Sequence, residues 1–280
     1  MGSVTQVTWI EKLEEWLNVD VDTMDPAFPG TLPIKPHNQT SNQLITSEHM
    51  LLPENREMFL QAVRDYKDQG WQAVHSRVAI AASQAGCLYI SPYYNEVKAH
   101  ADPALWPNVA DPALDHTMSA RMIQMLETYK RLYKETGKEQ PLVKAASFIS
   151  PQEAMAAGEM GCHHATISPE VLTKLAALPY DQSKQPGEGI PKSTGYPYAN
   201  APPTPTRLAK LSKIDPLAPA GWDGKLASTD IDYLANNGAE LQKAIEADPE
   251  TKKRLFEALE LFKGGEMRSK AAIEEAMKLV

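Results

Sequence analysis

The chain has 280 residues, of which 42% are hydrophobic and 23% charged, a globular composition that excludes disorder throughout. With a formal net charge of −8 and scattered Lys and Arg residues, nucleic acid is not an expected partner. The sequence has no apolar run of the roughly 18 to 20 residues that cross a bilayer, and residues 1–6 lack a signal pattern, which predicts a cytoplasmic protein without a membrane partner. Cys87 and Cys162 cannot form a disulfide framework and lack metal-ligand spacing, so no metal or other cofactor is expected.

The first 70 residues predict alternating helices and strands. Apolar positions at helical spacing indicate an amphipathic helix over 9–17, and a short strand follows near 19–22. Residues 35–42 are polar for a strand, but their flanking prolines and the helical region at 43–50 favour one. A further helix is expected over 53–68, ending before a glycine.

An internal repeat gives the clearest indication of fold class. Residues 79–92 and 153–169 each read as a small-residue helix, a glycine stop, a short apolar strand and Ser-Pro. A third strand, 142–148, lies between them and follows a helix at 117–134. Such helix and strand units are typical of a parallel sheet, so the sequence predicts an α/β fold.

The C-terminal third differs from the rest of the chain in composition. Residues 179–223 hold nine of the 22 prolines and predict an irregular connector or lid. From 224 to 280 the chain is charged and helical. Asp248 and Pro249 begin a helix there, and a stripe of Leu255, Leu259 and Phe262, expected to dock on the rest of the chain, stops at Gly264-Gly265.

Five motifs in order carry a resemblance to a known family. They are Val19-Asp20-Val21-Asp22-Thr23-Met24-Asp25, Gln39-Thr40-Ser41-Asn42, Tyr89-Ile90-Ser91-Pro92-Tyr93, Ala145-Ala146-Ser147-Phe148, and the segment from Gly161 to Pro169. In this the chain resembles the transaldolase family, (β/α)8-barrel (TIM-barrel) enzymes that transfer a dihydroxyacetone unit between sugar phosphates by Schiff-base chemistry. The resemblance implies carbohydrate metabolism of the pentose phosphate type and a small sugar or sugar phosphate as partner.

The resemblance also implies roles for particular residues. Asp22 would be the first-strand general acid and base, Thr40 and Asn42 would hold substrate hydroxyls, and Ser91 and Ser147 would line the pocket. Barrel active sites lie at the carboxyl ends of strands, which agrees with these positions. Taken alone, the same residues read as a helix or turn cap at Asp22 and as small residues that close strands at Ser91 and Ser147.

The family's Schiff-base lysine, expected on the fourth strand, is not found in this sequence. Residues 19–172 number 154, which holds about five units at roughly 31 residues each. We therefore expect an incomplete barrel of about five to six strands over residues 1–178, shortened between about 70 and 79, then a connector over 179–223 and C-terminal helices over 224–280. Either a splice or gene-model loss or a real shortened paralogue accounts for the gap.

The sequence pattern does not favour any other lysine as a replacement for the missing Schiff-base lysine. Lys144 is three positions from Ser147, so strict alternation along a strand places the two side chains on opposite faces, with Lys144 towards the helices or the bottom rim. Lys35 reads as a solvated rim residue, and Lys98 as an exposed loop residue within reach of a substrate phosphate.

Two further departures concern charge. Where the family places basic phosphate-binding residues, this chain has Asn95-Glu96 and Ile149, so either Lys98 takes over or the ligand is not phosphorylated. His163 and His164 are adjacent on an expected strand and point to opposite faces, which favours a loop or strand-start role over a shared metal.

Two functions follow from these patterns. One is a transaldolase-type enzyme with Asp22 as acid and base, its lysine supplied by a fuller gene product. The other is a catalytically inactive shortened relative that binds a small polyol or a protein partner, and the missing lysine favours inactivity for this chain. An incomplete barrel exposes sheet edges, so a homo-oligomer is also expected.

Overall fold

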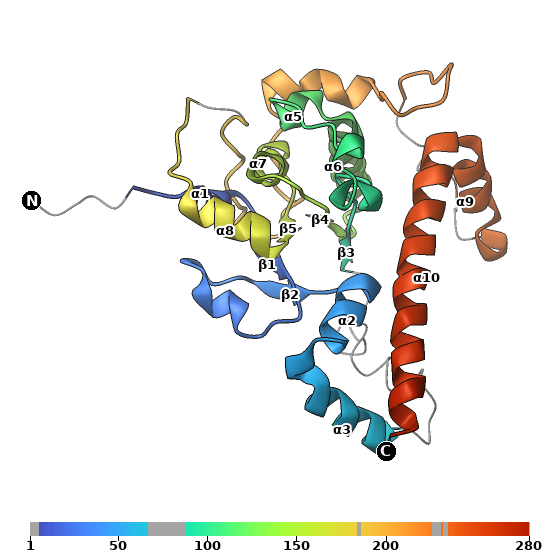
Figure 1. Ribbon diagram of the computed structural model, residues 1–280. Coiled ribbons are helices and arrows are strands. Elements are labelled where there is room, and N and C mark those ends of the chain that lie inside the picture. Colours follow the sequence, from blue (N-terminus) through green and yellow to red (C-terminus); the bar gives the residue numbers. More distant parts are fainter. Residues whose placement is uncertain (1–5, 67–87, 184–185, 226–230, 232–234, 280) are drawn as a thin grey trace, which may run out of the picture.

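The computed structural model describes residues 6–66, 88–183, 186–225, 231 and 235–279. Its centre is a sheet of five parallel strands in the order β2-β1-β5-β4-β3 (Figure 1). The strands are β1 (Asn18–Asp22), β2 (Asn38–Thr40), β3 (Tyr89–Ile90), β4 (Leu142–Ala145) and β5 (His164–Ile167). The prediction of an α/β, incomplete TIM-barrel fold with C-terminal helices is confirmed, since the described sheet is an open half-barrel.

Helices connect and cover these strands. The α-helices are α1 (Trp9–Trp16), α2 (Gln43–Met50), α3 (Arg56–Tyr66), α5 (Pro112–Asp115), α6 (Thr117–Thr136), α7 (Pro151–Met160), α8 (Pro169–Ala177), α9 (Ala235–Ala247) and α10 (Pro249–Met277). Short 3-10 turns are η1 (Phe28–Thr31), η2 (Pro53–Asn55), η4 (Val97–His100), η5 (Pro103–Leu105) and η6 (Thr206–Lys213). The helix expected at 79–85 lies outside the described residues, as does Cys87.

Local sequence signals account for several helix ends. Thr8 and Glu11 form a capping box at the start of α1, and Ser150 and Glu153 form another at the start of α7. Gly161 ends α7 in the left-handed conformation, at φ 89°. These short-range signals begin and end the helices that apolar spacing and the glycine stop predicted.

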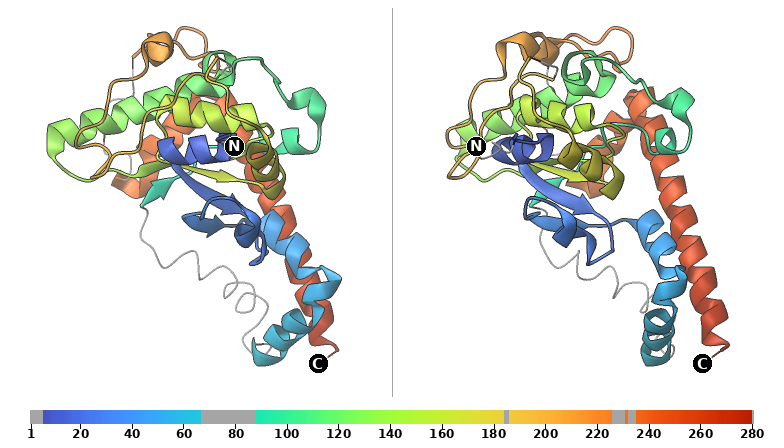
Figure 2. Two further views of the ribbon diagram at one scale, coloured as in Figure 1. Left: turned by 90° about the vertical axis from the view of Figure 1, so that its left-hand side faces the viewer. Right: turned by 60° about the vertical axis from the view of Figure 1, so that its left-hand side comes forward.

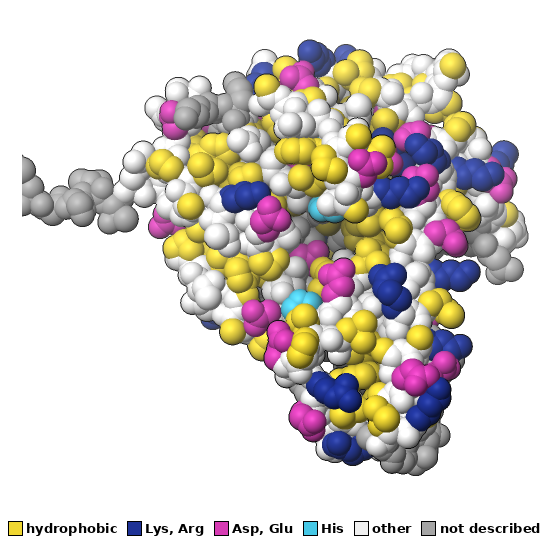
Figure 3. Space-filling model, in the orientation of Figure 1, with side chains coloured by type: hydrophobic (Ala, Val, Ile, Leu, Met, Phe, Trp, Pro, Cys, Tyr) yellow, Lys and Arg dark blue, Asp and Glu magenta, His cyan; other side chains and the backbone are white. Residues whose placement is uncertain are grey.

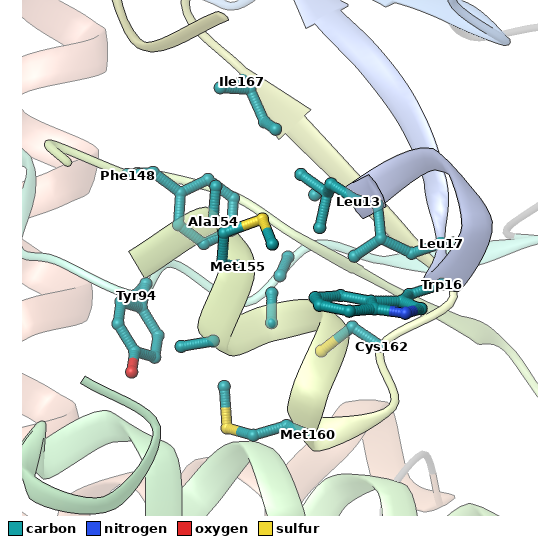
Figure 4. Close-up of a cluster of buried hydrophobic side chains, with 14 of the residues drawn as sticks. Leu13, Trp16, Leu17, Tyr94, Phe148, Ala154, Met155, Met160, Cys162 and Ile167 are labelled. Atoms are coloured by element: carbon teal, nitrogen blue, oxygen red, sulfur yellow. The ribbon is translucent and has the colours of Figure 1, made fainter. Parts of the chain in front are cut away.

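The main core lies between the sheet and helices α1, α6, α7 and α8, which cover one face of the sheet (Figure 1). Figure 4 shows Leu13 of α1 on the side of Met155 of α7, and Trp16 of α1 next to Cys162, while Ile167 of β5 lies above them and Met160 below. Gly158 makes the approach of the two helices possible, because a Cβ there would lie 2.8 Å from the Trp16 ring. The opposite, inner face of the sheet carries polar side chains.

Helix α10 spans the open side of the half-barrel. It contacts α2, which follows the edge strand β2, and η4, which follows the other edge strand β3. Both views in Figure 2 show it running past the sheet and then along α2 and α3. None of the helices in the described part of the chain is long and apolar enough to span a membrane.

One expectation about this helix is wrong and a second holds only in part. It continues through Gly264-Gly265 to Met277, because Gly265 packs on the main chain of α2 and is held there by tertiary contact. Of the expected docking stripe, Leu255 and Leu259 are 42% and 56% exposed, whereas Phe262 packs edge-on against Tyr93 with the ring centroids 6.2 Å apart. The buried positions of the helix lie beyond this stripe, at Gly265, Ser269, Ile273 and Ala276.

The Pro-rich segment is largely irregular, yet it is anchored to the core. Leu208 and Leu211 of η6 are buried. Arg207 pairs with Asp111 at 2.5 Å and with Glu159. The connector therefore packs as part of the same body over these residues.

Candidate functional site

A pocket of about 870 Å³ lies where the strands of the half-barrel end. Asp22 and Thr40 are the last residues of β1 and β2, and Ser91 and Ser168 directly follow β3 and β5. Parallel strands bring their carboxyl ends to one edge of the sheet, which is where barrel sites form. All five residues singled out from the sequence line this pocket, namely Asp22, Thr40, Asn42, Ser91 and Ser147.

Asp22 is the carboxylate of this pocket. The Thr40 hydroxyl donates a hydrogen bond to its Oδ1 at 2.9 Å, and Thr40 also contacts the hydroxyl of Thr166 on β5. Burial raises the pKa of Asp22, while the Thr40 hydrogen bond and the nearby His100 oppose that rise. A carboxyl with a raised pKa is suited to exchange protons with a bound ligand.

The other predicted residues differ in what remains available to a ligand. Asn42 uses its Oδ1 to cap α2, accepting from the amides of Leu44 and Ile45 at 3.0 and 3.2 Å, so its amide NH₂ is the group left to face the pocket. Ser91 is exposed at the rim.

Ser147 occupies an uncommon backbone conformation, with φ 67°. Its hydroxyl donates to the carbonyl oxygen of Asn95 at 2.9 Å and lies 2.8 Å from Nε2 of His100. The turn at Ser147 thereby ties the end of β4 to the segment that follows β3.

Several pocket residues were missed by sequence reasoning. His100 was not predicted because nothing in the sequence of η4 marks it; desolvation lowers its pKa, against the opposing effect of Glu153 and Asp22. Thr166 could have been found from the alternation of polar and apolar residues along its strand. Tyr93 also lines the pocket, and burial raises its pKa to about 12.

The expectation for Lys144 is wrong. Its side chain lies on the inner face of the sheet and lines the same pocket as Ser147. Regular alternation ends at Ala145, the last residue of β4, and the positive φ of Ser147 turns the chain. Both side chains therefore reach one cavity although they are three positions apart.

The charges around the pocket do not form an obvious phosphate site. Lys98 lines the pocket, but its Nζ pairs with Glu257 of α10 at 2.9 Å. Arg254 lines a neighbouring hollow and is paired with Glu96 and Glu250. Figure 3 shows Lys and Arg interspersed with Asp and Glu on the visible face.

The adjacent histidines have separate partners, as their positions on a strand predicted. Nδ1 of His163 accepts from the amide of Val143 at 3.0 Å, whereas His164 begins β5 and faces Asp20. Burial lowers the pKa of His163 to about 4. Within the described residues, no group of three or more His, Cys, Asp or Glu side chains is arranged to hold a metal ion.

A half-barrel of parallel strands, with a pocket at their carboxyl ends that takes its polar groups from the strand ends, is the architecture of a barrel-derived α/β protein. Residues 74–198, a little under half of the chain, match the family model described as Transaldolase/Fructose-6-phosphate aldolase. The predicted resemblance to transaldolases is confirmed over this region, which contains β3, β4 and β5, while β1 and β2 lie before it. A search of curated proteins found no match.

Proposed function

We propose that this chain binds a small polyol or sugar with a free carbonyl group, and that Asp22 acts on it as general acid and base in transaldolase-type chemistry. The observation that carries the proposal is the position of Asp22, whose pKa is raised and whose Oδ1 accepts from Thr40 in a pocket of about 870 Å³. The family match of residues 74–198 supports the same class of chemistry.

The surroundings of Asp22 suit a ligand rich in hydroxyl groups. Thr40 and Ser147 offer hydroxyl oxygens as acceptors, since their protons are donated to Asp22 and to the Asn95 carbonyl oxygen. Ser91 offers a hydroxyl and Asn42 an amide donor. Neutral groups of this kind exchange hydrogen bonds with sugar hydroxyls without requiring a charge on the ligand. We therefore assign substrate binding to these four residues.

An unphosphorylated ligand fits the charges better than a phosphorylated one. The described lining residues of the pocket include no arginine, and Lys98 is paired with Glu257. Two planar N–H donors of an arginine are the usual means of gripping a phosphate. We expect dihydroxyacetone to bind at least as tightly as fructose 6-phosphate.

Calorimetric titration of the full chain with dihydroxyacetone and fructose 6-phosphate tests the binding step. Replacing Asp22 with Asn is expected to abolish turnover of fructose 6-phosphate while leaving binding within about tenfold. Asp223→Asn, on an exposed turn outside the pocket, is the matched control and should change neither. A wild-type chain that binds neither compound contradicts the proposal.

A second candidate is a shortened relative that binds without turnover. Two observations favour it. The described part of the chain has five strands, against the eight of a complete barrel, and the family's fourth-strand lysine has no counterpart at the matching place in this sequence. Binding of dihydroxyacetone without cleavage or transfer of fructose 6-phosphate, in a folded wild-type sample, would select this function.

A further inference from the structure

A buried lysine lies on the inner face of the sheet, deep in the candidate pocket. The side chain of Lys144 is only 6% exposed, and its Nζ lies 2.6 Å from Oδ2 of Asp20, which is fully buried. The ammonium group also stands over the ring of Tyr89, 4.5 Å from its centroid. Burying the charged amine of Lys144 costs free energy, which the counter-charge of Asp20 offsets only in part. A lysine kept at such a cost is a candidate for a functional role.

The partner of this lysine, Asp20, has a second polar neighbour and one free carboxylate oxygen. Nδ1 of His164 lies 3.0 Å from the same Oδ2, and Nε2 of that ring lies 3.1 Å from the amide nitrogen of Asn18. Since the Asn18 amide nitrogen is a donor, Nε2 accepts and Nδ1–H donates to Asp20. The second oxygen of Asp20, Oδ1, is buried without a hydrogen-bond partner.

Lys144 and Asp22 line the same cavity at adjacent levels of the sheet. Asp20 and Asp22 are two residues apart on β1, so their side chains share a face and are separated by about 7 Å along the strand. Thr166, which pairs with Asp20 in register, contacts Thr40, the hydrogen-bond donor to Asp22. The amine of Lys144, which pairs with Asp20, thus lies one layer deeper in the half-barrel than the carboxyl group of Asp22.

We propose that Lys144 is the imine-forming residue of this chain, with Asp20 as the base that frees its amine and Asp22 as the acid that removes water. This inference rests on the proposed function, because it assumes a ligand with a free carbonyl group in the pocket. It assigns the nucleophile to β4 of this structure, which leads into the Ala145-Ala146-Ser147-Phe148 motif. This is not the fourth strand of the complete family barrel, where the resemblance places the lysine, because that strand belongs to the segment missing between about residues 70 and 79.

The steps balance with the groups present. The ammonium of Lys144 gives a proton to Asp20, which converts a buried ion pair into two neutral groups. The amine then adds to the carbonyl carbon, a C–N bond forms, and the proton of the amine moves to the former carbonyl oxygen. Protonated Asp22 gives its proton to that hydroxyl, which leaves as water, and the product is a protonated imine.

Reductive trapping of the full-length chain with dihydroxyacetone and cyanoborohydride tests this assignment. We expect one three-carbon adduct per chain, saturable in dihydroxyacetone, which peptide mapping places on Lys144. Lys225, whose side chain is 81% exposed, serves as the internal reference for unspecific modification. Lys144→Arg, which keeps the positive charge beside Asp20, should lose the adduct, and Lys174→Met, which removes an exposed lysine outside the pocket, should keep it.

The outcomes separate this inference from the proposed function. A saturable adduct on another lysine overturns the role of Lys144 and leaves imine chemistry standing. No saturable adduct in a wild-type chain that binds dihydroxyacetone also overturns it, and leaves binding standing. Absence of both adduct and binding overturns the two proposals together. Because the mapping uses the wild-type protein, a variant that fails to fold does not obscure the result.

Discussion

Gly265 of α10 lies against the main chain of Gln43, the first residue of α2, so closely that a Cβ on the glycine would be 2.8 Å from the Gln43 carbonyl oxygen. This contact fixes the helix that spans the open side of the half-barrel. The preceding residues Leu261 and Phe262 then line the candidate pocket. A C-terminal helix thus completes a site whose polar residues come from the strands.

Adding a methyl group at this contact should therefore destabilise the fold. Gly265→Ala is expected to lower the free energy of unfolding by about 1–3 kcal/mol, because the obstacle is main chain and cannot turn aside. Gly264→Ala is the matched control, since its nearest neighbour is the flexible end of Arg268 at 3.6 Å, and it should raise stability by about 0.5–1 kcal/mol. Urea unfolding of both variants measures the difference. Equal effects would contradict the close packing.

The ion pair of Asp20 and Lys144 predicts a large and non-additive effect on stability. Asp20→Asn leaves a buried lysine without its counter-charge and should cost about 3–5 kcal/mol. The double variant Asp20→Asn with Lys144→Met should cost less than the sum of the single changes, with a coupling of about 0.5–3 kcal/mol. Lys174→Met, which breaks an exposed pair with Glu170, should cost at most about 1 kcal/mol. Additive single effects would mean that the two side chains do not interact.

The hydrogen bond from Thr40 lowers the pKa of Asp22, against the rise that burial causes. Replacing Thr40 with Val removes the donor and keeps the shape, so the pKa of Asp22 should rise further. Ser41→Ala is the control, because Ser41 lines the same pocket but bonds to Asn42 and Thr46. Carbon-13 NMR titration of the carboxyl groups measures the pKa directly. A fall or no change on Thr40→Val would show that the hydroxyl does not stabilise the charged form.

Because His116 is buried with a lowered pKa, the protein is expected to lose stability in mild acid. It is buried in the core, where its Nδ1 accepts from the amide of Met118 and its ring stacks on Tyr94 at 4.1 Å. Burial, with a smaller contribution from Arg254, lowers its pKa to about 4. The unfolded chain binds the proton first as pH falls, so the free energy of unfolding should decrease between about pH 6.5 and 4, by up to about 3 kcal/mol from this residue.

The variant His116→Asn isolates that effect, because asparagine keeps a capping oxygen for the Met118 amide and does not titrate. Urea unfolding at a series of pH values should show a flatter dependence for the variant between pH 6.5 and 4. His49→Asn, at the end of α2, controls for the loss of a histidine. An unchanged slope in His116→Asn would assign the acid sensitivity to other groups.

The elements near the start of the chain and around β4 and β5 were predicted well because their signals are local. Thr8 with Glu11 and Ser150 with Glu153 mark helix starts within three residues. The small-residue helix α7 and its glycine stop predicted the strand that follows. The resemblance to transaldolases, not a local signal, singled out Asp22, Thr40, Asn42, Ser91 and Ser147, and the structure has all five lining one pocket because strand ends of a parallel sheet share an edge.

Local patterns in the sequence were enough to predict the fold class and most helix boundaries, because periodicity and caps act over a few neighbouring residues. The five candidate pocket residues were instead taken from the resemblance to transaldolases, and their roles stay a prediction. The tertiary arrangement placed Lys144 against Asp20, because that contact depends on strand register and on the turn at Ser147. It also decided that α10 passes through Gly264-Gly265, where contact with α2 outweighs the weak helix propensity of glycine. Such choices depend on which distant residues meet, and no short segment of sequence contains that information.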